Sequence, residues 1–209
     1  MPGRPTLKIA EIFAGIQGEG LRMGRPAVFV RLAGCNLRCS FCDTKSAWRG
    51  GRLMTAAAVA AAVKKARRPW SGEWICLTGG EPFTQDFGPL AERLRAEGFR
   101  IQVETNGTIF KDIPLDWFTV SPKPPDYDAA PEFQARAREV KLVVSRELTL
   151  RAVGRVRAAF PASVPVFLQP ESNRPESRDR AILLLRRASA RGLGDVRLGV
   201  QLHRVFGLR

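Results

Sequence analysis

The sequence lacks three features that would otherwise decide its class. It has no long apolar run, only one histidine and only four cysteines. No stretch approaches the roughly 20 apolar residues that a membrane-spanning helix needs, and residues 1–8 lack the apolar core of a secretory signal peptide. Three of the cysteines lie within eight residues, which suits a metal better than a disulfide framework. These absences predict a cytoplasmic protein with reduced cysteines and no membrane anchor.

Acidic residues are also few: 20 Asp and Glu stand against 34 Lys and Arg, a formal net charge of +14. A charge of this size raises the question of a nucleic-acid partner. The basic residues are scattered, however, aromatic content is only 8%, and no recognisable nucleic-acid-binding module is present. Solvated basic faces are therefore favoured over a specific RNA partner, although some of the charge could attract an anionic substrate.

Strand-like and helix-like patterns alternate along the chain, and no internal repeat is visible. Strands are expected at 8–14, 26–34, 73–78, 99–104, 116–121, 139–144, 164–169 and 196–201. Helices are expected at 55–68, with Thr55 as the capping residue, and at 87–97, 147–159 and 177–191. Alternating βα units predict an α/β fold with a parallel sheet. At 209 residues the chain is shorter than the roughly 250 of a full eight-unit barrel, so we expect a single domain, 1–209, forming an incomplete, open parallel βα barrel.

The stretch 35–44 carries the strongest chemical signal. Cys35, Cys39 and Cys42 are spaced so that three thiolates can turn inward from one loop, and soft thiolates select iron–sulfur clusters or zinc. A structural zinc site would normally close with a fourth Cys or His, but Cys76 lies in an apolar strand-like run and His203 near the far end. Three cysteines on a [4Fe–4S] cluster would leave one iron open to a small molecule. A zinc knuckle or incidental cysteines are the plain alternative.

Polar residues follow several expected strands, where the ligand of a parallel sheet or barrel lies. Three glycines in 15–20 mark a loop whose backbone can approach a ligand, although this loop alone is more typical of a plain turn. Arg31 lies inside an apolar run and would need an anionic partner if it is buried. We expect the polar residues at the strand ends to converge on one pocket.

The Cys-x3-Cys-x2-Cys loop with Phe41 before its last cysteine resembles the signature of radical S-adenosylmethionine (SAM) enzymes. Further motifs narrow the resemblance to the 7-carboxy-7-deazaguanine synthase family over nearly the whole chain. They are Glu11-Ile-Phe, Gln17-Gly-Glu-Gly20, Arg31-Leu-Ala-Gly-Cys-Asn, Thr78-Gly-Gly-Glu-Pro82, Glu104-Thr-Asn-Gly107, Ser121-Pro-Lys123, Gln169-Pro170 and Gln201-Leu-His203.

This resemblance implies a magnesium-dependent ring contraction of 6-carboxy-5,6,7,8-tetrahydropterin to 7-carboxy-7-deazaguanine, with release of ammonia. The reaction would stand on the route to queuosine, a tRNA modification, and related 7-deazapurines. A 5′-deoxyadenosyl radical made from SAM would take a hydrogen from the carbon that bears the carboxylate. No side chain need act as a nucleophile, because the cofactors carry the chemistry. A homodimer and an electron donor such as flavodoxin are further expectations of the family.

The resemblance also assigns roles to residues. The cluster would be held by Cys35, Cys39 and Cys42, and Mg²⁺ by Thr44. SAM would be contacted by Phe41, Asp43, Gly79, Gly80, Glu104, Asn106, Ser121, Lys123 and Gln169. The pterin would be surrounded by Ile16, Gln17, Gly18, Glu19, Arg31, Thr78, His203 and Arg209. Leu202 and Arg204 depart from the family pattern, which bears on fine substrate positioning and not on the reaction class.

The tail 203–209 invites a separate hypothesis. A final strand would bring His203 to the pocket rim, the apolar Val205, Phe206 and Leu208 would fold back as a short lid, and the carboxylate of Arg209 would accept from the pterin. A frayed tail with a core-packed histidine is the alternative. Two other functions stay open for the whole chain: a glycyl-radical-enzyme activase, and a non-catalytic metal-containing RNA-binding module.

Overall fold

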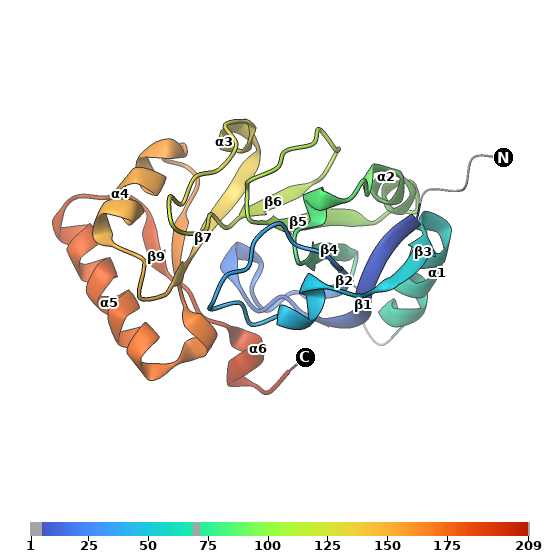
Figure 1. The fold of residues 1–209 in the computed structure, drawn as a ribbon, viewed down its shortest axis with the longest axis horizontal. Helices are drawn as coiled ribbons and strands as arrows, with labels where there is room; N and C mark the ends of the chain where they lie inside the picture. Colours follow the sequence, from blue (N-terminus) through green and yellow to red (C-terminus); the bar gives the residue numbers. More distant parts are fainter. Residues whose placement is uncertain (1–5, 69–71, 209) are drawn as a thin grey trace. The chain divides into compact units, whose positions relative to one another are not determined.

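The computed structural model describes residues 6–68 and 72–208, and the chain divides into two compact units (Figure 1). The first unit comprises residues 1–16, 25–105 and 111–117, and the second comprises 17–24, 106–110 and 118–209. None of the helices that the described residues form is long and apolar enough to cross a membrane.

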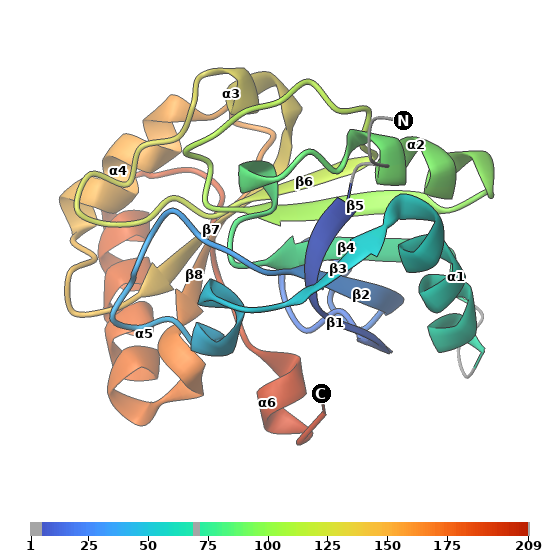
Figure 2. The ribbon, with the colours of Figure 1, turned by 45° about the vertical axis from the view of Figure 1, so that its right-hand side comes forward.

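The first unit is a five-stranded sheet with two α-helices (Figure 2). Its elements are β1 (Thr6–Ile16), β2 (Pro26–Leu32), β3 (Arg52–Thr55), α1 (Ala56–Arg67), β4 (Trp74–Gly79), α2 (Gly88–Ala96) and β5 (Arg100–Thr105), with short 3-10 turns at Lys45–Trp48 and Pro82–Thr84. The strands lie in the order β3-β1-β2-β4-β5.

The sequence pattern predicted a parallel sheet, but one of these strands is antiparallel to its neighbours. β2, β4 and β5 run parallel, but β1 is antiparallel to both β2 and β3. The connection from Ile16 to Pro26 is too short for a crossover, so it can only return the chain antiparallel. The edge strand β3 was not predicted, because four residues give too little alternation to detect.

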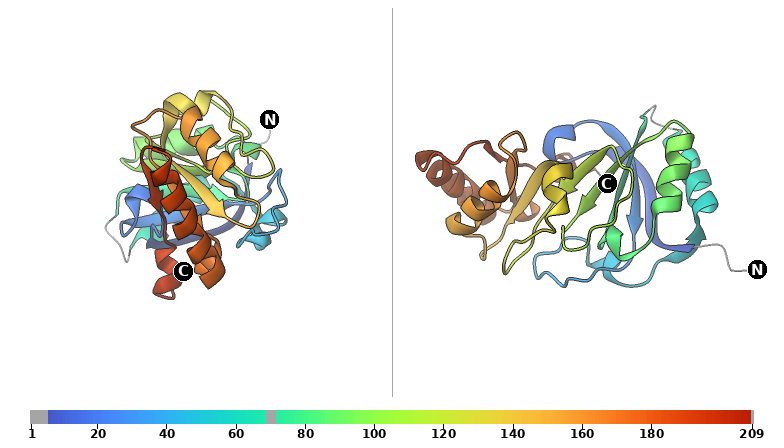
Figure 3. Two further views of the ribbon diagram at one scale, coloured as in Figure 1. Left: turned by 90° about the vertical axis from the view of Figure 1, so that its left-hand side faces the viewer. Right: turned by 90° about the horizontal axis from the view of Figure 1, so that it is seen from above.

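The two helices of this unit cover one side of its sheet. Thr55 caps α1 as predicted, since its hydroxyl oxygen accepts from the N–H of Ala58 at 3.2 Å. The helices lie side by side (Figure 3). They bury Val59, Val63, Leu90 and Leu94 completely, and Ile75 and Leu77 of β4 are equally buried. The alternate residues of β4, Trp74 and Cys76, therefore face the other side of the sheet, where they pack with Phe29.

The second unit contains four parallel strands in the order β6-β7-β8-β9. Its elements are β6 (Trp117–Val120), α3 (Glu132–Arg136), β7 (Ala137–Val144), α4 (Leu150–Ala159), β8 (Val166–Pro170), α5 (Pro175–Ala190), β9 (Val196–Leu198) and α6 (Leu202–Val205), with 3-10 turns at Gly20–Arg22 and Glu171–Asn173. Helices α4 and α5 lie side by side (Figure 3). The five-residue α3 follows residues 122–131, a segment rich in proline, and it was not predicted.

The end of the chain differs from the expectation. The final strand stops at Leu198, three residues earlier than expected; the N–H of Gly199 still donates to the carbonyl of Leu168 in β8, and the chain then turns into α6. Val205 and Phe206 are 61% and 66% exposed, and Leu208 is also exposed. These exposed side chains are not part of the core, and the hypothesis that they fold back as a short lid stays a prediction.

Candidate functional site

Polar side chains of the first unit lie on the side of the sheet opposite to the buried Ile75 and Leu77. Arg31 pairs in register with Glu11 on one neighbouring strand and with Thr78 on the other. The Nε of Arg31 donates to the carboxylate of Glu11 at 2.7 Å, with 18% of the arginine side chain exposed. The prediction that Arg31 needs an anionic partner is confirmed. The contact uses Nε, so the two terminal nitrogens keep the geometry to fork a second carboxylate.

The turn after β4 packs tightly against the end of β2 and the start of the cysteine loop. The N–H of Gly80 donates to Leu32 at 3.0 Å and that of Glu81 donates to Gly34 at 2.8 Å. A Cβ at Gly80 would overlap the carbonyl of Gly34 and lie 2.9 Å from the Cβ of Cys35. Glu81 is fully buried, and one of its oxygens accepts from Thr105 at 2.8 Å and from the N–H of Phe83 at 3.1 Å. Only glycine permits this approach to the cysteine loop.

The cysteine loop itself has little regular structure, and the four cysteines are thiols that are not paired in disulfides. Burial raises the pKa of the Cys35 thiol above its usual value, an effect that the N–H of Leu37 opposes and the charges of Glu81 and Cys42 reinforce. In the described part of the chain, no group of three Cys, His, Asp or Glu side chains is arranged to hold a metal ion. The donor chemistry nevertheless fits an iron–sulfur cluster, with three half-buried thiols in one loop, the first of which lies against Gly80.

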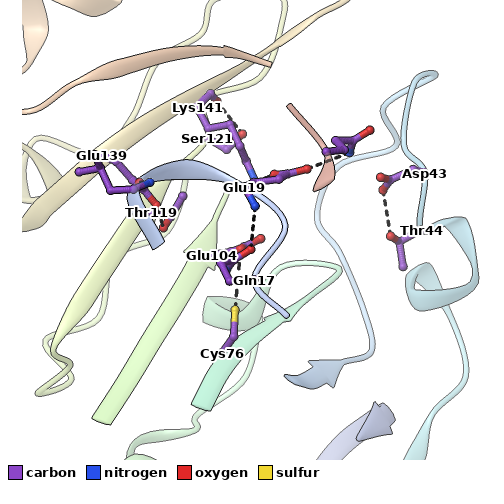
Figure 4. Close-up of polar contacts among 12 residues, drawn as sticks. Gln17, Glu19, Asp43, Thr44, Cys76, Glu104, Thr119, Ser121, Glu139 and Lys141 are labelled. Atoms are coloured by element: carbon purple, nitrogen blue, oxygen red, sulfur yellow. Dashed lines mark hydrogen bonds and ion pairs between the residues drawn. The ribbon is translucent and has the colours of Figure 1, made fainter. Parts of the chain in front are cut away.

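The other residues of this unit that were predicted to bind Mg²⁺, SAM or the pterin lie in the cysteine loop or on the same sheet. The hydroxyl of Thr44 donates to the carboxylate of Asp43 at 2.9 Å, which gives a pair of oxygen donors of the kind Mg²⁺ prefers (Figure 4). Phe41 is half-buried in the loop, and Ile16 ends β1 opposite Pro26 instead of lying in the predicted loop 15–20. Gly79 ends β4 with φ 146°, a conformation that favours glycine.

Glu104 lies near the end of β5, and its carboxylate has a neighbour that the sequence did not suggest. The Sγ of Cys76 lies 3.7 Å from its Oε1 (Figure 4). Cys76 is completely buried, which agrees with its place in an apolar strand-like run of the sequence. Its position beside Glu104 gives it an orienting contact as well as a packing role.

The second unit presents its own row of polar side chains. Residues at i and i+2 of a strand share a face, so Thr119 with Ser121, Glu139 with Lys141, and Phe167 with Gln169 line one face of its sheet. The register supports this, because Thr119 pairs with Glu139 and Lys141 pairs with Phe167. Val140, Leu142 and Leu168, on the opposite face, are completely buried.

Two predicted SAM contacts of this unit bond to each other. The Nζ of Lys123 donates to the carbonyl of Ser121 at 2.6 Å and to its hydroxyl oxygen at 2.5 Å. That hydroxyl in turn donates to the carbonyl of Lys141 at 2.7 Å (Figure 4). Asn106 stands in the turn after β5, where its side-chain oxygen accepts from the N–H and the hydroxyl of Thr108.

Gln169 is the most unusual side chain of this face. It is 1% exposed, and neither its amide nitrogen nor its amide oxygen has a hydrogen-bond partner among the described residues. Gly199 leaves space beside it, since a Cβ there would lie 2.6 Å from the amide oxygen. A buried amide with two unmet hydrogen-bonding atoms fits a residue that receives a polar ligand.

The glycine loop lies against α6 and strand β7. The side-chain oxygen of Gln17 accepts from the N–H of Glu19 at 3.2 Å (Figure 4). The carbonyl of Gly18 accepts from the N–H of Leu202 at 2.9 Å, and a Cβ at Gly18 would overlap the ring of His203. Three predicted pterin contacts, Gln17, Gly18 and Glu19, thus lie together with His203. Arg209 lies outside the described residues.

Several residues of these polar faces were given no role from the sequence. They are Glu11 and Gln201, which were noted only as parts of motifs, and Thr119, Glu139 and Lys141. Glu139 and Lys141 are charges inside an apolar strand, the same signal that drew attention to Arg31, and this signal could have found them.

Comparisons with known proteins identify the family and the fold of the chain. Residues 30–177 match the radical SAM superfamily. Relatives named 7-carboxy-7-deazaguanine synthase include one from Rhodospirillum rubrum, 38% identical over 96% of this chain and 92% of that protein. Another, from Aquifex aeolicus, is 35% identical over 97% of this chain and 94% of that protein. The crystal structure of QueE from Escherichia coli superposes with a TM-score of 0.79 and 29% identity, covering 95% of each chain. The expected fold, an incomplete, open parallel βα barrel of the radical SAM type, is confirmed.

Proposed function

Because this chain belongs to the 7-carboxy-7-deazaguanine synthase family of the radical SAM superfamily, we propose that it converts 6-carboxy-5,6,7,8-tetrahydropterin to 7-carboxy-7-deazaguanine with release of ammonia, in queuosine biosynthesis. The observation that carries this function is the similarity of the whole chain to enzymes of that name. It does not favour a glycyl-radical-enzyme activase or a non-catalytic RNA-binding module.

The cluster and SAM, when bound, supply the electron and the 5′-deoxyadenosyl radical that begin the ring contraction. Cys35, Cys39 and Cys42 would hold the cluster. Gly80 has no side chain that would collide with Cys35. Around SAM, the polar contacts would come from Glu104, Asn106, Ser121, Lys123 and Gln169, with Phe41 and Asp43 from the cysteine loop. The unmet hydrogen bonds of Gln169 support its place in this set. Thr44 would hold Mg²⁺, and its hydrogen bond to Asp43 supports an oxygen-rich site there.

Pterin recognition is assigned to residues of the glycine loop and of β1, β2, β4 and α6. They are Ile16, Gln17, Gly18, Glu19, Arg31, Thr78 and His203, with Arg209 as a further candidate. Arg31 can fork the substrate carboxylate with its two terminal nitrogens, because its Nε already bonds to Glu11. The Glu19 carboxylate has acceptor sites beyond those its present neighbours use, which suits the N–H groups of the amino-pyrimidine edge.

The partners and location are proposed on narrower grounds. Arg38 and Lys45 stand at 5.2 Å and 5.9 Å from the ring centre of Trp48 beside the cysteine loop, and this exposed basic group would suit an acidic electron donor such as flavodoxin. A homodimer follows the family resemblance. Four cysteines without a disulfide suit the cytoplasm.

The decisive experiment incubates anaerobically reconstituted protein with SAM, a reductant, Mg²⁺ and the tetrahydropterin. We expect the deazaguanine product and ammonia in equal amounts. SAM cleavage that yields no product with the pterin but a radical on a glycyl-radical enzyme would support the activase instead. Tight zinc with RNA binding and no SAM cleavage would support the non-catalytic module.

A further inference from the structure

Strand β7 reaches the glycine loop through two charged residues to which neither the motifs nor the similarity to relatives gave a role. The first is Glu139, which is 1% exposed. Its Oε2 accepts from the backbone N–H of Leu21 at 2.5 Å, and its Oε1 accepts from the hydroxyl of Thr119 at 2.7 Å. Gly20 allows this approach, because a Cβ there would lie 2.6 Å from the Cδ of Glu139. Glu139 therefore fixes the backbone of the loop just after Glu19.

The second is Lys141, two residues further along the same face of β7. Its ammonium group forms an ion pair with the Oε2 of Glu19, while the Oε1 of Glu19 accepts from the Nε2 of Gln201 at 2.8 Å (Figure 4). Gln201 is itself held, since its N–H donates to Asn173 at 3.1 Å and its carbonyl accepts from Asn173 at 2.9 Å. Both oxygens of the Glu19 carboxylate are thus fixed in direction.

Burial separates this ion pair from an ordinary surface pair. The side chains of Lys141 and Glu19 are 10% and 12% exposed, whereas Lys64 in its pair with Glu97 is 56% exposed. An exposed pair contributes little, but removing one partner of a buried pair leaves an uncompensated charge. Burying the Glu19 carboxylate with Lys141 costs desolvation free energy. A role in orienting this carboxylate toward a ligand would explain why the pair is buried.

We propose that Glu139 and Lys141, here called the β7 clasp, are positioning residues for pterin recognition. Glu139 sets the path of the loop through Leu21, and Lys141 aims the Glu19 carboxylate at the substrate. This inference rests on the proposed function, in which Glu19 receives the pterin. It extends that function to two residues that need not touch the substrate themselves.

The kinetic test compares Lys141→Met and Lys141→Arg with the wild type. We expect Lys141→Met to lower kcat/KM for the pterin by about tenfold to a hundredfold, as for a lost charge-assisted hydrogen bond, mainly through KM. Cleavage of SAM without pterin should fall much less, and Lys141→Arg should recover part of the loss. In a Glu19→Gln background, Lys141→Met should have little further effect, because it acts through Glu19. The surface variant Lys64→Met is the matched control, with wild-type kinetics expected.

The structural test does not depend on the reaction. Hydrogen exchange of the peptide that contains Leu21 should be faster in Glu139→Gln than in wild type, and unchanged in the exposed control Glu147→Gln. If Glu139→Gln does not fold, Thr119→Val removes one of its hydrogen bonds while keeping a strand-compatible shape, and it should increase the same exchange rate to a smaller extent.

The outcomes separate the inference from the function on which it rests. If the wild type does not convert the pterin, the proposed function fails, while the exchange experiment still tests the hold of the clasp on the loop. Wild-type KM in Lys141→Met, equal losses of pterin turnover and SAM cleavage, additive effects with Glu19→Gln, or unchanged exchange at Leu21 would each overturn the β7 clasp.

Discussion

Replacing Gln169 with methionine should stabilise the protein without its cofactors and weaken SAM binding at the same time. The side chain is 1% exposed, and both of its amide atoms lack hydrogen-bond partners among the described residues. Each unsatisfied buried group costs about 1 to 3 kcal/mol. Methionine has a similar length and flexibility and can fill the same space, so the variant removes the cost without creating a large cavity.

The magnitude follows from these terms. A gain of about 2 kcal/mol in the free energy of unfolding corresponds to an increase in Tm of roughly 4 to 8 °C for a chain of this size. Losing one or two neutral hydrogen bonds to SAM, each worth about 0.5 to 1.5 kcal/mol, should weaken SAM binding by a few-fold to a hundredfold.

The assay is urea unfolding of the apoprotein, followed by equilibrium SAM binding to the reconstituted protein. Gln102→Met is the matched control, because Gln102 is equally buried but has an interaction partner, and its loss should destabilise the protein. A destabilised Gln169→Met protein would mean that the amide is satisfied within the fold. Unchanged SAM affinity would mean that Gln169 does not face the cofactor.

Three further predictions concern the cysteine loop and the turn beside it. Cys39→Ala should abolish the uptake of about four irons per chain and SAM cleavage, whereas Cys76→Ala should retain the cluster; iron bound equally well by Cys39→Ala would contradict the ligand set. In the apoprotein, alkylation of Cys35 by iodoacetamide should have its midpoint above the pH of an ordinary thiol, because burial raises its pKa. The folded apoprotein then holds this proton to a higher pH than the unfolded chain, so its stability should fall as pH rises above the ordinary thiol pKa; Cys35 reacting fastest of the four thiols at neutral pH would refute this. Gly80→Ala should lower the free energy of unfolding by about 1 to 3 kcal/mol through overpacking, as measured by urea unfolding. The control Gly194→Ala, with no atom within 4 Å of the new Cβ, should be nearly neutral. Equal effects of the two substitutions would contradict the close approach of Gly80 to the cysteine loop.

Local patterns in the sequence were sufficient for most of the fold. The helix that begins after Thr55 and the strand that contains Cys76 follow from periodicity, capping and apolar runs, which are local properties. The errors lie where the outcome depends on partners elsewhere. Strand β3 is paired with its neighbour β1, and the last strand, which pairs with β8, ends at Leu198 and not at the expected residue 201.

The candidate site shows the same division. Sequence reasoning could state that Arg31 needs an anion, but not that Glu11 supplies it, because that pairing depends on a shift of register between Ile9 and Glu11. The partner of Glu19 is separated from it by 122 positions along the chain. No local pattern contains such a contact, whereas the chemistry of each partner is visible in its residue type.

The two-residue period of a strand explains why ligand-binding positions can be predicted within these apolar segments. In β7, Val140, Leu142 and Val144 are buried on one face, which leaves Glu139, Lys141 and Val143 on the other. A charge at the wrong parity would be buried among apolar side chains, at a cost of several kcal/mol. The two buried charges of this strand, Glu139 and Lys141, therefore share the face that bears Thr119, Ser121 and Gln169, whereas Arg138, at the other parity, is exposed at the start of the strand. A one-residue change of register would exchange the two faces. The same alternation that builds the core thus determines which residues of β7 can serve the ligands.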